Sequence, residues 1–163
     1  MFALGFVSVY EQIGEGLEAS ERETIFTAYI KALDESPDTY RKDAAALEEW
    51  AKSLESADSV APNADGDVGQ KALAAIASQV AEGNFAYSKF FAIGLFRLLE
   101  LTGAKDPKAL GSLVTALGVR QDMVNRDLLT YKGVLSKLSA AKELQEVRNV
   151  VLYHECLLLV NHG

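Results

Sequence analysis

Residues 85–101, FAYSKFFAIGLFRLLEL, decide the fold of this chain. A helix made of these residues is apolar on nearly every side, and such a helix is either buried in a protein core or spans a membrane. The longest unbroken apolar run, residues 90–96, is only seven residues long, whereas a bilayer span needs about 20. Lys89, Arg97 and Glu100 interrupt the segment. We therefore predict that it forms the buried central helix of a soluble helical protein.

Apolar residues at helical spacing continue on both sides of this segment. The other predicted helices cover residues 2–15, 20–35, 37–54, 70–82, 107–117 and 121–148. No convincing alternation of apolar and polar residues, the pattern of a half-buried strand, occurs in the sequence. The sequence therefore predicts an all-α fold, a single-domain bundle of about seven helices around a buried central helix.

Local patterns give predictions for two of these helices. Ser20 and Glu23 have the spacing of a capping box, which favours a helix start at that point. Asn84 is predicted to cap the central helix, because Asn is a preferred residue before a first helical turn. Four residues of helix 20–35 are predicted to face the core: Ile25, Tyr29, Ile30 and Leu33.

The domain organisation follows from two segments without this pattern. Residues 55–69 collect Ser, Asp, Asn, Pro and Gly, which predicts a flexible linker. Residues 150–160 are apolar except for His154 and Glu155, and eleven residues are too short to cross a bilayer. We therefore predict one helical domain over residues 1–149, with an atypical apolar tail over residues 150–163.

Charge and cysteine content limit the classes of function. The formal net charge is -7, and residues 1–60 alone carry five basic and thirteen acidic residues. Such a chain repels nucleic acid and anionic lipid as a whole. Its single cysteine, Cys156, excludes an intramolecular disulfide and suits a reducing compartment. The N-terminus shows neither a signal peptide nor a transit peptide.

Candidate catalytic and metal motifs fail on their spacing. His154 and Glu155 resemble the start of a zinc-protease motif, but Leu158 stands where the second histidine is needed. Residues 14–19 fit a dinucleotide fingerprint superficially, but they follow a predicted helix instead of a strand. Two histidines and one cysteine cannot build an ordinary structural zinc site. We expect no catalytic residue, no cofactor, no metal site and no small-molecule substrate.

An alternative function concerns residues 107–131, where two predicted helices joined by a turn at Gly118 resemble a helix-turn-helix. The residues that would read a DNA groove are Arg120, Gln121, Asn125 and Arg126. Asp122, Asp127 and the net charge oppose this interpretation, because phosphate contacts dominate affinity for DNA. A nucleic-acid-binding regulator therefore remains the second hypothesis.

Several separated segments of the chain resemble one family. They are residues 2–10 (FALGFVSVY), 25–33 (IFTAYIKAL), 40–44 (YRKDA), 47–51 (LEEWA), the central segment 85–101, 124–131 (VNRDLLTY), 135–138 (LSKL) and 141–144 (AKEL). In order and spacing these segments resemble the thylakoid-formation family, also known as a photosystem II auxiliary protein of cyanobacteria and chloroplasts.

The resemblance implies an all-helical protein with a coiled-coil character and no enzymatic activity. It implies a role in photosystem II biogenesis and repair and in thylakoid membrane formation, through association with the thylakoid FtsH protease complex. The expected location is the chloroplast, in the stroma and peripherally at the thylakoid membrane, or the cyanobacterial cytoplasm and thylakoid surface if the chain is bacterial.

Candidate docking residues lie within the matching segments: Tyr40, Arg41, Trp50, Arg126 and Asp127. Core packing is the competing interpretation of Tyr40 and Trp50. For Arg126 beside Asp127, a structural charge pair is the competing interpretation.

Overall fold

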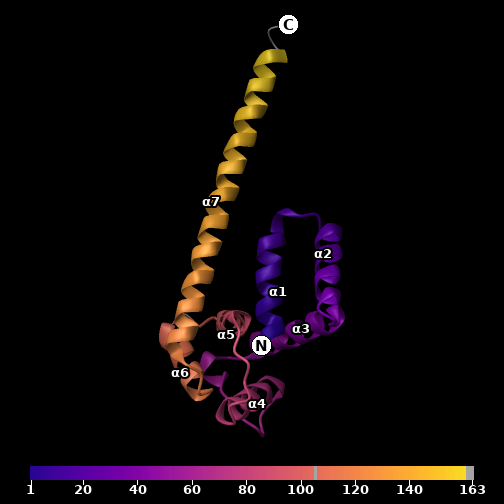
Figure 1. The fold of residues 1–163 in the computed structure, drawn as a ribbon. Coiled ribbons are helices and arrows are strands. Elements are labelled where there is room, and N and C mark those ends of the chain that lie inside the picture. Colours follow the sequence, from indigo (N-terminus) through magenta and orange to yellow (C-terminus); the bar gives the residue numbers. More distant parts are fainter. Residues whose placement is uncertain (105, 161–163) are drawn as a thin grey trace. The chain divides into compact units, whose positions relative to one another are not determined.

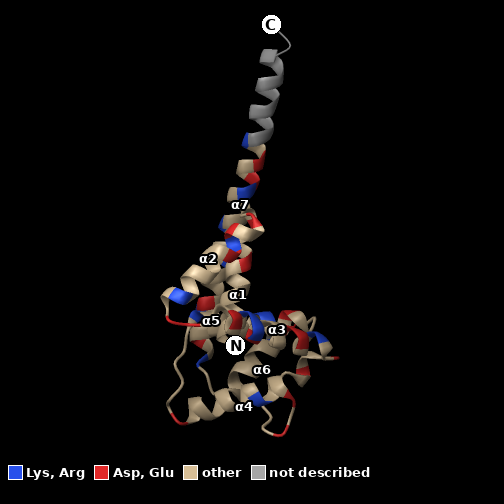
Figure 2. Ribbon diagram, turned by 90° about the vertical axis from the view of Figure 1, so that its right-hand side faces the viewer, with Lys and Arg blue, Asp and Glu red and all other residues tan. Residues whose placement is uncertain are grey.

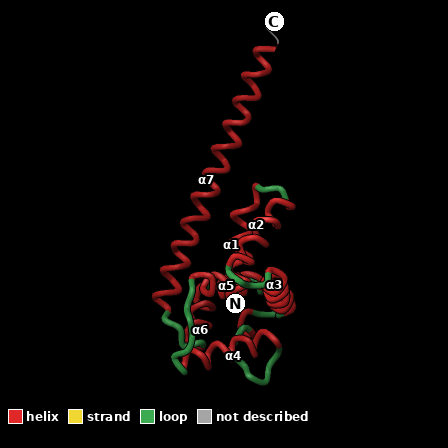
Figure 3. The backbone as a smooth tube through the Cα atoms, turned by 45° about the vertical axis from the view of Figure 1, so that its right-hand side comes forward, coloured by secondary structure: helices red, strands yellow, loops and turns green. Residues whose placement is uncertain are grey.

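A computed structural model describes the backbone of residues 1–104 and 106–160, and the side chains of these residues except 107 and 149–160. Its helices are α1 (Phe2–Ile13), α2 (Ala19–Ala32), α3 (Pro37–Ser53), α4 (Val68–Ala81), α5 (Lys89–Leu101), α6 (Pro107–Ala116) and α7 (Gln121–Val160), with 3-10 turns η1 (Gly14–Gly16) and η2 (Ala57–Ser59). Helices and loops account for all of the described backbone, which contains no strand (Figure 3). The predicted all-α fold of about seven helices is confirmed.

The chain divides into two compact units, Met1–Leu128 and Leu129–Gly163. The first contains α1 to α6 together with the start of α7, and it holds the hydrophobic core (Figure 1). The second consists of the rest of α7, one uninterrupted helix as far as residue 160. The tail predicted over residues 150–163 begins within this helix, and the side chains from residue 149 onward lie outside the described part.

The α5 helix is the buried centre of the first unit, as the sequence predicts. Its fully or almost fully buried residues are Phe91, Ala92, Ile93, Gly94, Leu95, Leu98 and Leu99. It begins later than predicted, because the Ser88 hydroxyl accepts a hydrogen bond from the backbone N–H of Phe91 (3.1 Å) and caps the helix there. Asn84 instead ends α4, where its backbone N–H bonds to the carbonyl of Gln79 (2.9 Å).

The α1 and α5 helices cross at a contact between two glycines. A Cβ atom on Gly5 would overlap the carbonyl oxygen of Phe90, and one on Gly94 would overlap the carbonyl oxygen of Met1. Only residues without a side chain allow two helix backbones to come this close. This crossing makes α1 the principal neighbour of α5, and α3 packs against both helices.

The predicted start of α2 at Ser20 is wrong, because the helix begins slightly earlier. The helix begins at Ala19, with the backbone carbonyl of Glu18 accepting from the N–H of Arg22 (2.9 Å), so Ser20 lies inside its first turn. A capping box does occur at the start of α4. There the Asp67 carboxylate accepts from the N–H of Gln70 (3.0 Å), and the Gln70 side chain accepts from the N–H of Asp67 (3.3 Å).

The predicted inward face of α2 is also mostly wrong. Ile30 is fully buried, but Ile25, Tyr29 and Leu33 are 44%, 51% and 52% exposed. Phe26 takes their place, because its ring packs against Phe6 (6.0 Å) and Tyr10 (5.1 Å) of α1. The helix therefore has two apolar stripes side by side. The rest of the first unit buries one of them, and on the other Tyr29 stacks on Phe6 (5.7 Å) while its side chain stays half exposed.

Residues 55–69, predicted as a linker, form irregular backbone around η2 before α4 begins at Val68. The segment is tied to the first unit in two ways. Val60 is 4% exposed, and the N–H of Asn63 donates to the carbonyl of Gln70 (3.2 Å). Its predicted flexibility stays a prediction.

The glycine crossing gives a first test of the fold. Replacing Gly94 with Ala would force a methyl group against the Met1 carbonyl, so we expect a loss of about 1–3 kcal/mol in the free energy of unfolding or a failure to fold. Gly133 in α7 is the matched control because nothing lies within 4 Å of its Cβ position. There the same substitution should leave stability unchanged or raise it by up to about 1 kcal/mol. Urea unfolding followed by circular dichroism measures both, and equal effects would contradict the close contact.

Candidate functional site

Tyr40 lies in an aromatic cluster at the base of α1 and the start of α3. Its ring meets Phe2 (5.9 Å) and Phe6 (5.7 Å) edge to face, and both phenylalanines contact Phe90 of α5 in the same manner. Tyr40 is 8% exposed. Burial, followed by the nearby Glu35 carboxylate, raises the pKa of its hydroxyl. Edge-to-face pairs add about 0.5–1.5 kcal/mol each to the burial of their surface, so the aromatic cluster as a whole holds α1, α3 and α5 together.

Arg41 joins α3 to both helices of the α1–α2 hairpin. Its guanidinium donates to Glu11 of α1 (2.6 Å) and to Glu23 of α2 (2.6 Å), and it lies over the ring of Phe26 at 4.1 Å. Glu11 also pairs with Arg22 of α2 (3.2 Å). Burial alone would lower the pKa of Arg41, but the hydrogen bonds to Glu11 and Glu23 outweigh it and raise the pKa. The sequence did not indicate this network, because its members are 18 and 30 residues from Arg41.

Trp50 is packed against the first turn of α4. A Cβ on Gly69 would overlap the indole ring, so Gly69 lies directly on the ring face. The indole N–H is buried without a regular hydrogen bond. Asp67 lies near it, and the pKa of this carboxyl is lowered first by the backbone N–H of Gln70 and then by the indole. Trp50 is 6% exposed, so it anchors α4 to α3.

Arg126 and Asp127 lie in the second turn of α7, with opposite environments. Asp127 is 7% exposed and accepts a hydrogen bond from the hydroxyl of Tyr87 (2.9 Å). Burial and this bond raise the pKa of Tyr87. The Arg126 side chain is 68% exposed, with its Nε 3.8 Å from Asp127. Asp127 thus ties the extended segment before α5 to α7, while Arg126 faces solvent.

The five candidate docking residues therefore do not form one surface. They belong to three sets of contacts that share no residue: Tyr40 with Arg41, Trp50 alone, and Arg126 with Asp127. Core packing explains Tyr40, Trp50 and Asp127, and an ion-pair network explains Arg41. Arg126 is the member of this set with a largely exposed side chain.

The structure contains the two helices and the turn that the helix-turn-helix hypothesis requires, but their charges do not favour binding to DNA. α6 and α7 are joined by a tight turn at Gly118, which has a φ of 71°. Arg120 Nε lies 3.7 Å from a carboxylate oxygen of Asp122, and Arg126 has Asp127 beside it. Both arginines of this region thus have an adjacent carboxylate, whereas binding to a phosphate backbone needs uncompensated positive charge.

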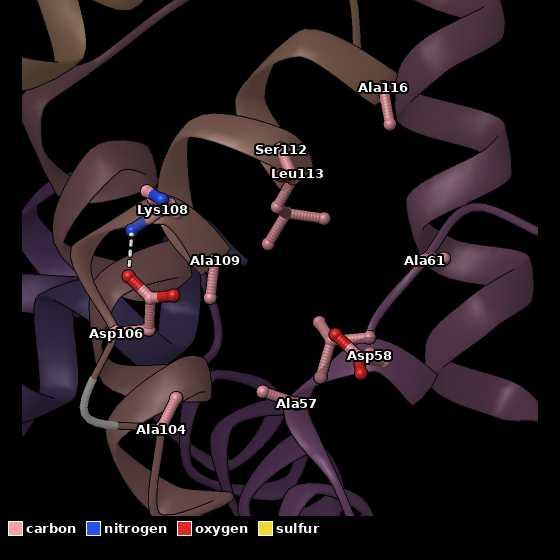
Figure 4. A pocket seen from close by; sticks show the side chains of 11 residues that line it. Ala57, Asp58, Ala61, Ala104, Asp106, Lys108, Ala109, Ser112, Leu113 and Ala116 are labelled. Atoms are coloured by element: carbon pink, nitrogen blue, oxygen red, sulfur yellow. Dashed lines mark hydrogen bonds between the residues drawn. The ribbon is translucent and has the colours of Figure 1, made fainter.

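A hollow of about 540 Å³ lies between η2 and α6 (Figure 4). Five of its eleven lining residues are alanines, so its depth comes from short side chains. The Asp58 carboxylate points into it, across from Ala109 and Leu113, as Figure 4 shows. Asp106 at its edge is engaged in capping α6, where it accepts from the N–H of Lys108 (2.8 Å).

The residues that the structure describes contain no group of three or more His, Cys, Asp or Glu side chains arranged to hold a metal ion. None of their helices combines the length and apolar character that a bilayer crossing requires. The side chains of the two histidines and of Cys156, considered above as zinc ligands, lie outside the described residues.

A family model and individual relatives both match most of this chain. The model of the family described as "Thylakoid formation protein" matches residues 1–149. Protein THYLAKOID FORMATION1, chloroplastic, of Oryza sativa is 48% identical over 148 residues, which cover 88% of this chain and 51% of that protein. Protein Thf1 of Nostoc punctiforme is 35% identical over 156 residues, covering 86% of this chain and 65% of that protein. The chain thus spans about half the length of the plant relative.

A solved structure is similar as well. The structure of Psb29 superposes with a TM-score of 0.56 over 85% of this chain and 73% of that chain, at 22% sequence identity. At this identity the likeness concerns the fold alone, and the neighbour is helical like the present chain.

The contacts of Arg41 predict a stability effect. Arg41→Ala leaves Glu11 and Glu23 without their shared partner and uncovers the Phe26 ring, so we expect a loss of about 1–2 kcal/mol in unfolding free energy. Arg41→Lys should recover less than half of that loss, because an ammonium group cannot donate to two carboxylates in the fixed fork of a guanidinium. Arg97→Ala is the control, because it breaks one exposed pair with Glu100 (3.3 Å) and should cost less than about 0.5 kcal/mol.

A second stability test concerns Tyr87 and Asp127. Tyr87→Phe removes the hydroxyl and leaves the buried carboxylate without its donor, which should cost about 1–3 kcal/mol. Combining it with Asp127→Asn should recover part of the loss, because the remaining group is uncharged. Thermal unfolding of the two variants measures this, and a Tyr87→Phe variant as stable as the parent chain would refute the role of the bond.

Proposed function

This chain belongs to the thylakoid formation protein family, and from that membership we propose that it acts in thylakoid formation and photosystem II biogenesis and repair as a non-enzymatic helical docking protein. The observation that carries the proposal is the family match over residues 1–149, which contains the whole first unit. Its partner in this proposal is the thylakoid FtsH protease complex. Its location is the stromal side of the chloroplast thylakoid, or the equivalent surface in a cyanobacterium.

The names of the relatives support the cellular setting. The relatives from Oryza sativa and Arabidopsis thaliana carry "chloroplastic" in their names, and further relatives come from cyanobacteria. Contact with the membrane in this proposal is peripheral and goes through the protein partner, because a chain of net charge -7 is repelled by anionic lipid.

The mechanism that suits such a protein is differential binding. A docking protein stabilises whichever state of an assembly it binds more tightly, and the size of the shift is set by the difference in its two affinities. A rigid surface is favourable for this, since little conformational entropy is lost on association. The Gly5–Gly94 crossing and the Arg41 network provide rigidity in the first unit.

Of the five candidate docking residues, Arg126 is the one that contacts the partner in this proposal. Arginine is enriched among residues that dominate binding energy at interfaces, and the Arg126 side chain is 68% exposed. Tyr40, Trp50 and Asp127 contribute through the shape of the first unit, because they are buried.

Capture from thylakoid extract tests the proposal. The immobilised chain should retain FtsH subunits, detected by immunoblot, and Arg126→Ala should lower the amount retained by about tenfold, the effect of one interface arginine. Lys89→Ala, at another exposed position, is the matched control and should retain FtsH normally. Circular dichroism must show that both variants are folded. If an intact plant relative retains FtsH and this chain does not, the proposal fails for this chain.

A further inference from the structure

A row of exposed apolar residues lies on α2. We call it the α2 stripe: Ile25, Ala28, Tyr29, Ala32 and Leu33. These residues follow the spacing of a continuous helix face, and all five are exposed. Isolated exposed apolar residues are ordinary, but a continuous row is a sign of an interaction surface.

Acidic residues border this stripe at both ends. Glu18 and Glu21 precede it on the same side of the helix, and Asp34 and Glu35 follow it. Residues 11–36 carry seven acidic and two basic residues, a net charge of -5. Two copies of the stripe packed against each other would therefore oppose carboxylate to carboxylate. The negative charge around the stripe favours a basic partner with an apolar face.

The second unit offers such a face. We call residues 129–148 the α7 shaft, a part of α7 whose side chains are all described. It carries four basic and two acidic residues, a net charge of +2, and Figure 2 shows both signs along it. Leu129, Leu144 and Val147 are 74%, 71% and 63% exposed. At 1.5 Å per residue the shaft is about 30 Å long, longer than the stripe.

The two surfaces are complementary in shape as well as in charge. Between Leu129 and Leu144, the same side of the shaft presents Gly133, Ser136 and Ala140 at helical spacing. Small residues let a second helix approach closely, while the stripe presents large side chains such as Ile25 and Leu33. Lys137 and Arg148 lie along one flank of this side of the shaft.

We propose that the α7 shaft of a second copy of this chain packs on the α2 stripe. Leu33 of the stripe and Leu144 of the shaft are 52% and 71% exposed, so each surface offers apolar side chains to a partner. In a dimer with two-fold symmetry each copy supplies one stripe and one shaft, and the contact forms twice. Reversible association driven by opposite charge and apolar burial is strongest at low ionic strength.

Sedimentation velocity of the full chain over a range of concentrations tests this. We expect a monomer–dimer equilibrium that weakens as salt is raised. Ile25→Glu disables the stripe, and Leu144→Glu disables the shaft. Each variant alone should dimerise at least about tenfold more weakly than the parent chain. Val68→Glu, which places the same group at a 64% exposed position on α4, is the control and should dimerise like the parent chain.

A mixture of the two variants distinguishes this pairing from the others. The Ile25→Glu chain keeps an intact shaft and the Leu144→Glu chain an intact stripe, so the mixture should form a heterodimer held by one contact. Normal dimerisation of Leu144→Glu alone would indicate stripe-to-stripe pairing, and normal dimerisation of Ile25→Glu alone would indicate shaft-to-shaft pairing. Either result overturns the proposal, as does a parent chain that stays monomeric at every concentration. The function proposed above is tested separately by FtsH capture.

Discussion

The contact between Gly5 and Gly94 is the constraint on which the first unit depends. It brings the backbones of α1 and α5 so close that a methyl group on either residue has no room. This closeness places Phe6 of α1 within 5.1 Å of Phe90 of α5, ring centroid to ring centroid. The aromatic cluster around Tyr40 therefore follows from the glycine contact. A wider crossing would separate these rings and remove the edge-to-face geometry that favours them.

The α1–α2 hairpin depends on this arrangement indirectly, through α3. α2 buries only Phe26 and Ile30 deeply, so apolar burial alone holds it weakly. Arg41 compensates, because it bonds to Glu11 and Glu23 and covers the Phe26 ring from α3. These pairs are partly exposed, and such pairs are weak one by one. Their shared guanidinium makes them a network, and the start of α3 is fixed in turn by Tyr40 in the aromatic cluster.

Much of the fold could be predicted from periodicity, and the misses have physical causes. The all-α class, the buried α5 and the long α7 follow from local patterns of apolar residues. Ser20 has the chemistry of a cap, but the chain enters α2 two residues earlier, at Glu18, while the equally suitable Asp67 does cap its helix. On α2 two apolar stripes adjoin, and a sequence cannot say which one a neighbour will cover. The network of Arg41 and the bond from Tyr87 to Asp127 join residues far apart in sequence, so spacing gives no signal for them.

The candidate docking residues come from segments that resemble a family, and three of the five are buried. Such segments identify residues that maintain the fold more readily than residues that bind a partner. Tyr40, Trp50 and Asp127 are each held by a partner that tolerates little change: an aromatic ring, a glycine face and a tyrosine hydroxyl. Substitution at such buried positions costs stability through packing or an unsatisfied polar group. Exposed positions such as Ile25 carry no such cost, so their apolar character needs another explanation than the fold of the single chain. The proposed pairing supplies that explanation. The α2 stripe is apolar and bordered by carboxylates, the α7 shaft is basic and has small residues, and each surface is suited to cover the other.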